Sequence, residues 1–251
     1  MKPIYQFNIL KNDKSIIHGV TKKSIDEKLL FSLALHTGEN RTDILKNRKK
    51  LFNNIIGKEK FLFVGANQTH SSNIKIINET LSKDFILIDD CDSLITNQKN
   101  TILTILTADC VPILLYDRVK NVVGAVYAGW RGTKENIIKK SIYSMIRDFS
   151  SDPKDIIASI APSIGMCCYE IGDEVAKYFL NYPYALTSKK NKKYNLNLAK
   201  INKIQLEEAG VLNINIELSN ICTSCEVEDY FSYRKEVGCS GRFMSFIGLK
   251  G

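Results

Sequence analysis

A cysteine and a histidine lie where the sequence predicts turns beside strands. Cys110 ends the segment 107–110, which joins two apolar, β-rich runs, and a side chain at such a junction can point into a cleft. Its thiolate would serve as a soft metal ligand or a nucleophile, whereas the simplest alternative is a small buried hydrophobe. His70 follows a predicted strand in a polar stretch. It is either an exposed loop residue or, with a partner such as a cysteine, a zinc ligand.

An arginine lies in the segment Gly129-Trp130-Arg131-Gly132, between a predicted strand and a predicted helix. The N-terminus of a helix carries unpaired N–H groups and partial positive charge, and a guanidinium offers paired donors to phosphate or carboxylate. The glycine spacing is not that of a Walker loop. The segment is therefore either an anion site or a structural turn.

The seven cysteines include a single CxxC, formed by Cys222 and Cys225. A structural zinc site needs a second pair, which Cys167 with Cys168, or Cys239, would have to supply. Free thiols are the simpler interpretation. The N-terminus lacks the apolar run of an export signal, so we expect a cytoplasmic protein with reduced cysteines.

The positive charge is spread along the chain. The formal net charge is +8, and the one dense basic cluster is Lys189–Lys193. A solvated loop accounts for this cluster better than a nucleic-acid patch does, so no nucleic-acid partner is expected. A basic surface would favour anionic small substrates. Near the C-terminus, residues 230–235 with Arg242 combine aromatic and cationic side chains, as either a base-stacking and anion-binding surface or a sheet edge.

The elements that must position these residues are strands and helices in irregular alternation. The chain of 251 residues shows no fixed repeat, no linker, no GxGxxG and no apolar run long enough for a membrane helix. These features predict an α+β fold of mixed β-sheets flanked by helices, in a single domain over residues 1–251, without a membrane partner. We predict strands at 15–20, 61–64, 74–77, 85–88, 101–106, 111–116, 122–128, 156–160, 214–218 and 242–249, and helices at 42–56 (ending at Gly57), 137–149, 173–180 and 197–209.

Motifs spread over nearly the whole chain carry a family resemblance. They are His18-Gly19-Val20-Thr21, Leu35-His36-Thr37-Gly38-Glu39 with Asn47-Arg48, Gln68-Thr69-His70, Thr107-Ala108-Asp109-Cys110-Val111-Pro112, Ala128-Gly129-Trp130-Arg131-Gly132, Pro162-Ser163-Ile164-Gly165 with Cys168-Tyr169-Glu170, Cys222-Thr223, Phe231-Ser232-Tyr233-Arg234 and Gly241-Arg242. In this order they resemble the laccase-domain or polyphenol-oxidase family, also described as the peptidoglycan editing factor family. Its bacterial and vertebrate members are described as purine nucleoside phosphorylases.

The resemblance implies a catalytic zinc site with one departure. The family binds zinc through a histidine after the early strand, the cysteine of an A-D-C motif and a histidine two residues before G-W-R-G. The matching positions are His70, Cys110 and Tyr127. A phenol is a poor zinc ligand, so the implied site is weakened: Tyr127 binds as phenolate, another group replaces it, or the metal is lost. The three histidines of the chain are too few for a multicopper oxidase, so copper is not expected.

The function that the resemblance implies is phosphorolysis of inosine, guanosine or adenosine to free base and ribose 1-phosphate. Adenosine deamination and methylthioadenosine phosphorolysis are implied as further activities. Arg131, with Arg48 and Arg242, would hold phosphate, and Cys110, His70 and Arg131 would be catalytic. Two alternatives stay open: a hydrolase that uses Cys110 as nucleophile on a peptidoglycan precursor, and a metal-depleted binding protein. The sequence does not indicate the oligomeric state.

Overall fold

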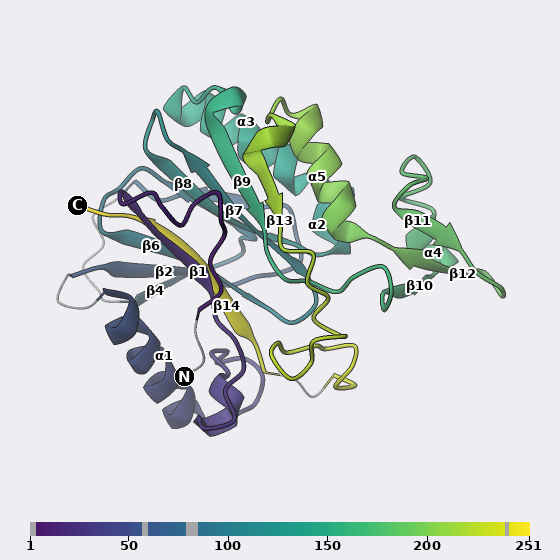
Figure 1. Ribbon diagram of the computed structural model, residues 1–251, viewed down its shortest axis with the longest axis horizontal. Coiled ribbons are helices and arrows are strands. Elements are labelled where there is room, and N and C mark those ends of the chain that lie inside the picture. The colour runs from purple at the N-terminus through teal and green to yellow at the C-terminus, as the bar shows by residue number, and fades with distance from the viewer. Residues whose placement is uncertain (1–3, 57–59, 79–84, 239–240) are drawn as a thin grey trace.

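The protein is built in four layers, two β-sheets packed face to face with helices on both outer faces (Figure 1). The computed structural model describes residues 4–56, 60–78, 85–238 and 241–251. Helix α1 (Arg41–Ile56) covers one sheet, and α3 (Ile137–Phe149) with α5 (Leu198–Glu208) covers the other. The expected α+β fold of mixed sheets flanked by helices is confirmed.

The first sheet has five strands and mixes parallel with antiparallel pairing. Strand β14 pairs antiparallel with both β1 and β6, whereas β2 runs parallel to both β6 and β4. The strands in spatial order are β1 (Ile16–Val20), β14 (Phe243–Leu249), β6 (Thr101–Thr107), β2 (Leu62–Ala66) and β4 (Phe85–Ile88).

The second sheet has six strands. Its centre is antiparallel, and its two outer pairs, β13 with β9 and β3 with β5, are parallel. In spatial order the strands are β13 (Ile216–Leu218), β9 (Ile156–Ile160), β7 (Val111–Asp117), β8 (Val122–Ala128), β5 (Ser93–Thr96) and β3 (Ile74–Ile76). A small third sheet contains β10 (Glu170–Gly172), β12 (Lys193–Leu196) and β11 (Leu186–Ser188).

The central strand β7 shows why the two sheets stack. Every residue of β7 is buried, because successive side chains point to opposite faces and both faces are covered. Ile113 and Leu115 pack in the core under the helices, whereas Leu114 and Tyr116 pack in the core between the sheets. The uninterrupted apolar run of this strand thus reflects its place in the middle of the four layers.

Each helix covers its sheet with an apolar face. Helix α3 buries Ile138, Ile142 and Met145, which recur at the spacing of one helical face. On the opposite side of the molecule, the ring of Phe52 in α1 stacks on Phe63 of β2 with 3.6 Å between centroids. The described part of the chain holds no helix with the length and apolarity that a membrane span requires.

Several predicted elements need correction. The predicted helix 173–180 is the single turn α4 (Asp173–Ala176), because residues 178–182 continue as tight turns with hydrogen bonds between residues three apart. The predicted strand 214–218 begins at Ile216, after a 3-10 turn. The short helix α2 (Trp130–Lys134), strand β5 and the three strands of the small sheet were not predicted. Gly57, the predicted end of α1, lies outside the described residues.

The basic cluster Lys189–Lys193 forms the turn between β11 and β12 and the start of β12. Its side chains are exposed, and Lys189 pairs with Glu170 at 2.7 Å. This agrees with the solvated loop expected from the sequence.

Candidate active site

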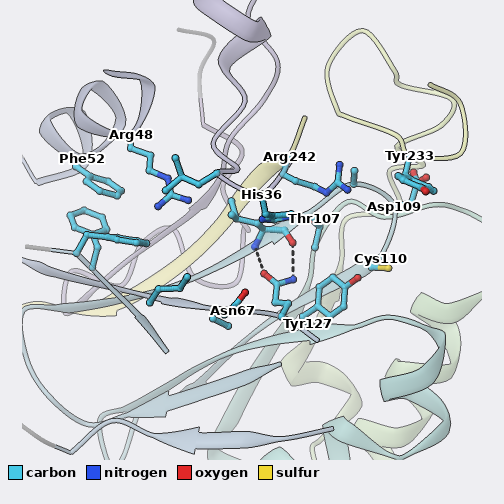
Figure 2. A pocket seen from close by; sticks show the side chains of 18 of the residues that line it. His36, Arg48, Phe52, Asn67, Thr107, Asp109, Cys110, Tyr127, Tyr233 and Arg242 are labelled. Carbon is cyan, nitrogen blue, oxygen red and sulfur yellow. Dashed lines mark hydrogen bonds between the residues drawn. The ribbon is translucent and has the colours of Figure 1, made fainter. Parts of the chain in front are cut away.

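The candidate site lies at one edge of the stacked sheets, where the chain passes twice from one sheet to the other. Residues 67–73 lead from β2 to β3, and residues 108–110 lead from β6 to β7. Since β2 and β6 are parallel neighbours, their carboxyl ends share this edge, and His70 and Cys110 follow them. Tyr127 joins them from the end of β8, where it pairs with Pro112 of β7. Figure 2 shows Cys110 and Tyr127 facing the same space.

The three side chains lie together as one group. The phenol oxygen of Tyr127 lies 2.8 Å from Nε2 of His70, and the two rings meet edge to face. The thiol of Cys110 lies beside the same phenol, and each of these two groups affects the pKa of the other. Gly129 packs against this group: a Cβ at that position would lie 3.3 Å from Sγ of Cys110 and 3.4 Å from the Tyr127 ring. A side chain at position 129 would therefore crowd the site.

A buried carboxylate that the sequence analysis missed holds His70 in place. His70 has a φ of +60°, a left-handed conformation that is uncommon for a residue other than glycine. Asp92, which is fully buried, accepts hydrogen bonds from the backbone N–H groups of His70 (3.2 Å) and Ser71 (2.7 Å) and from the Ser71 hydroxyl (2.6 Å). An acidic residue just before a strand is too common in sequences to reveal such a role.

Asp109 has a structural role of the same kind. Its φ is +86°, also left-handed. Oδ1 accepts from the hydroxyl of Thr223 at 2.6 Å, and Oδ2 accepts from the backbone N–H of Arg234 at 2.7 Å. Asp109 thus ties the turn that carries Cys110 to the segment 223–234, and both of its oxygens are engaged.

A large cavity opens onto these residues, and the charged side chains in its wall are mainly cationic. Its volume is about 1560 Å³. Of the described residues that line it, six are arginines or lysines and one is a carboxylate, Asp109. The cationic six are Arg41, Arg48, Lys49, Lys60, Arg234 and Arg242. An anionic ligand would be favoured in this cavity.

Two of the arginines that were expected to hold phosphate, Arg48 and Arg242, lie in the cavity wall with His36 (Figure 2). Arg48 is 5% exposed, donates from Nε to the carbonyl of Leu33 at 2.8 Å and packs over the ring of Phe85. Burial lowers the pKa of His36, and the positive charges of Arg242 and Arg48 lower it further. His36 therefore lies within electrostatic range of both arginines.

Arg131 is placed differently from the expectation. It is exposed, its guanidinium lies over the Trp130 ring at 4.5 Å, and it is absent from the described cavity lining. Its position in the first turn of α2 points it outward, although its charge still contributes to the lowered pKa of His70. Arg234, which was not among the predicted site residues, lines the cavity and lies over Tyr169.

The protonation states follow from burial. Burial raises the pKa of Tyr127 well above its ordinary value and raises that of Cys110 to about 11. Burial also lowers the pKa of His70, against the opposing effect of Asp92. At neutral pH the group therefore holds a phenol, a thiol and a neutral imidazole, and no thiolate–imidazolium pair is formed.

This donor set fits a tightly held zinc ion poorly. His70 and Cys110 are ordinary zinc ligands, but the third group is a protonated phenol already hydrogen-bonded to His70. A separate cysteine cluster is the better candidate for a metal. Each of its four sulfur atoms lies within 4.8 Å of the others, and the cluster consists of Cys167, Cys168, Cys222 and Cys225.

The fold and the site define a mixed α+β protein with a cationic cavity at the junction of two stacked sheets. Residues 18–250 match the family model described as multi-copper polyphenol oxidoreductase laccase. The chain belongs to this family, as the sequence motifs indicated.

Similar proteins are found in bacteria. The purine nucleoside phosphorylase CA_C1699 of Clostridium acetobutylicum is 38% identical, with 97% of this chain and 95% of that protein covered. Purine nucleoside phosphorylase YlmD of Bacillus subtilis is 32% identical, with 96% and 91% covered. The crystal structure of the hypothetical protein YfiH of Bacillus licheniformis superposes with a TM-score of 0.86 at 35% identity, covering 94% of this chain and 93% of that one.

Proposed function

We propose that this protein is a purine nucleoside phosphorylase, which converts inosine, guanosine or adenosine and phosphate into the free base and ribose 1-phosphate. The observation that carries the proposal is the charge of the cavity. Six cationic side chains and one fully engaged carboxylate line a space next to a cluster of proton-bearing groups. An anionic co-substrate fits these walls, and the related CA_C1699 and YlmD are both named purine nucleoside phosphorylases.

Phosphate would bind against Arg48, Arg242 and His36. A guanidinium offers two parallel donors to a phosphate, and these contacts are stronger than neutral hydrogen bonds. In the reaction a phosphate oxygen forms a bond to C1′ of the ribose while the bond from C1′ to the purine nitrogen breaks. Positive charge develops on the ribose, so an anion held beside it stabilises the transition state.

The leaving base takes the electron pair of the broken bond and needs a proton. The protonated phenol of Tyr127 can supply it, while the neutral imidazole of His70 stays hydrogen-bonded to the phenol oxygen. Tyr169 and Tyr233 line the cavity, each beneath an arginine, and offer flat faces on which a purine ring can stack. Phosphate and base are thus assigned to different residues of one cavity.

Zinc would be held only weakly beside Cys110. His70 and Cys110 would supply two ligands, and Tyr127 would bind only after losing its proton. No step of the phosphorolysis above requires the metal. Adenosine deamination is different, because it needs hydroxide at neutral pH, which a bound zinc ion supplies. We therefore expect phosphorolysis to persist in the presence of a chelator and deamination to be weak.

A nucleoside panel tests the proposal. The purified protein is incubated with inosine, guanosine, adenosine and methylthioadenosine, with and without phosphate and chelator, and the products are separated by chromatography. The expected result is free base only when phosphate is present. Absence of free base under every condition would overturn the assignment.

The same experiment separates the alternatives. A thiol hydrolase needs a reactive thiolate, and the protonated state of Cys110 makes it a poor nucleophile. Free base released without phosphate would indicate hydrolysis. Nucleoside binding without any product would favour the binding protein.

A further inference from the structure

Two loops beside the candidate active site bring together four cysteines that do not line its cavity. Strands β9 and β13 are parallel neighbours, so the loops that follow them leave the same edge of the sheet. These loops, residues 161–169 and 219–226, continue side by side: the N–H of Thr223 donates to the carbonyl of Ser163 at 3.1 Å, and Ser163 pairs with Cys222 in an isolated bridge. Cys167 and Cys168 of the first loop thereby meet Cys222 and Cys225 of the second.

The spacing of the sulfur atoms is that of a mononuclear metal site. Sγ of Cys225 lies 3.6 Å from Sγ of Cys167 and 3.5 Å from Sγ of Cys168, and every pair in the cluster lies within 4.8 Å. With a zinc–sulfur bond of about 2.3 Å, sulfur atoms at the corners of a tetrahedron are about 3.8 Å apart. The same distances are far too long for a disulfide, whose bond is about 2.05 Å. They are too short for thiolates bound to different iron atoms of a cluster.

The polypeptide around the sulfur atoms is also arranged as in a metal centre. The backbone N–H of Gly165 donates to Sγ of Cys222 at 3.1 Å, a contact that stabilises negative charge on a sulfur ligand. A Cβ at position 165 would lie 3.2 Å from Sγ of Cys167 and 3.1 Å from Cβ of Cys222. The absence of a side chain at Gly165 therefore lets the two loops close around the four sulfur atoms.

We propose that Cys167, Cys168, Cys222 and Cys225 bind one structural Zn²⁺ ion as a tetrathiolate. Four sulfur ligands in a tetrahedron favour zinc or a single iron ion, and a set of four protein ligands leaves no open position for catalysis. This site is separate from the weak one at His70, Cys110 and Tyr127, and it stands whether or not the protein is a phosphorylase.

The metal would stabilise one wall of the active-site cavity. Thr223 lies between the two cysteines of the CxxC and donates to Asp109, next to Cys110. Tyr169, which lines the cavity, follows Cys168 directly. Zinc would thus hold together two loops that contact the catalytic edge, although its four ligands are not part of the described cavity lining.

Metal analysis of matched variants tests the proposal. The full-length protein is dialysed against excess zinc and then against buffer without zinc, and the bound metal is measured by mass spectrometry. We expect one equivalent of zinc in the wild type, in Cys91→Ala and in Cys110→Ser, and a loss of that equivalent in Cys225→Ser. Cys91 is a buried cysteine outside both sites and controls for the loss of a thiol.

The proposal would be overturned by a zinc-free wild type, by an unchanged zinc content in Cys225→Ser, or by loss of zinc in Cys110→Ser alone. Tightly bound iron would overturn the choice of metal. If Cys225→Ser does not fold, the zinc contents of the wild type and of Cys110→Ser still test the proposal. A thiol reagent should release one zinc ion as four thiols react, and cobalt in place of zinc should show the visible bands of tetrahedral sulfur coordination. Thiols that react without releasing zinc would contradict the site.

Discussion

The phenol oxygen of Tyr127 lies 2.8 Å from Nε2 of His70, at the position where the family resemblance implied a second imidazole. A hydrogen bond between neutral groups is thus found where the resemblance implied a pair of metal ligands. Burial keeps the phenol protonated, because it raises the pKa of Tyr127. The residue that weakens the metal site is therefore also a proton donor facing the cavity.

Tyr127→Phe should slow phosphorolysis without weakening phosphate binding. The substitution removes the hydroxyl but keeps the ring that packs against His70 and Gly129. Loss of a proton donor typically lowers kcat by about 100-fold or more. The measurement is kcat and the KM for phosphate in the presence of a chelator. An unchanged kcat would show that Tyr127 does not donate the proton to the leaving base.

Tyr127→His should add a second bound zinc ion. The change restores three ordinary ligands at this edge, so zinc content should rise by about one equivalent above that of the wild type. Deamination of adenosine should increase with it, because bound zinc lowers the pKa of water. Metal content and inosine formation from adenosine are measured together. Retained zinc without faster deamination would show that hydroxide supply is not the limiting factor.

Arg242→Met should raise the KM for phosphate about tenfold or more. Hydrogen bonds to charged groups contribute about 1.5–3 kcal/mol, and each 1.4 kcal/mol is a factor of ten in affinity. Arg131→Met is the matched control, because Arg131 is exposed and stacked on Trp130 outside the described cavity lining. The KM for phosphate of both variants is obtained from initial rates at varied phosphate concentration. A larger increase in Arg131→Met than in Arg242→Met would indicate that phosphate binds at the start of α2.

Asp92→Asn should destabilise the fold and displace His70. The amide nitrogen would face backbone N–H groups that now donate to a carboxylate, leaving a buried donor without an acceptor. A loss of about 1–3 kcal/mol in the free energy of unfolding is expected. Asp90→Asn, at an exposed position, should change it by less than about 0.5 kcal/mol. Urea unfolding compares the two, and equal stabilities would contradict the role of Asp92.

His18 should make the protein less stable in acid. It is 3% exposed, its Nε2 accepts from the backbone N–H of Phe7 at 3.1 Å, and burial lowers its pKa to about 4. The unfolded chain, with a histidine pKa of about 6.5, binds more protons between these values. His18 therefore makes its full contribution to the free energy of unfolding above about pH 6.5. This contribution, on the order of 3 kcal/mol, is lost as the pH falls toward about 4.

His18→Gln isolates this effect. An amide oxygen can accept the same hydrogen bond but does not titrate in this range. The free energy of unfolding, measured in urea on both sides of this pH interval, should fall less in the variant than in the wild type. Parallel pH profiles would show that His18 is not responsible.

The long strands and helices could be predicted from the sequence because the pattern of their apolar residues reflects which faces are buried. β7 and β8 are buried along their whole length and mostly apolar since both of their faces are covered, and α3 shows a clear apolar face. The strands of the small sheet have three or four residues each and partly exposed side chains, which leave no periodic signal. Their pairing depends on chain reversals that composition does not reveal.

The candidate site also contains residues that could be predicted from the sequence and residues that could not. His70, Cys110 and Tyr127 were expected together because each belongs to a motif, and the structure brings them into contact. Asp92 acts through the backbone of a loop 21 residues or more away in sequence, so nothing near it indicates its partner. Arg131 was expected to hold phosphate, but a motif fixes the position of a residue on a turn and not the direction of its side chain, which here lies outside the described cavity lining. The cysteine cluster required the parallel pairing of β9 with β13.

Strand β14 has a consequence for how the protein is made. It lies between β1 and β6, so residues 243–249 fill the gap between segments that begin at residues 16 and 101. A ribosome that has finished residue 200 has made both neighbours but not the strand that joins them. Long-range pairing of this kind slows folding, and unpaired strand edges invite aggregation. The first sheet therefore closes only after translation has passed residue 249, and until then β1 has no partner strand in this sheet.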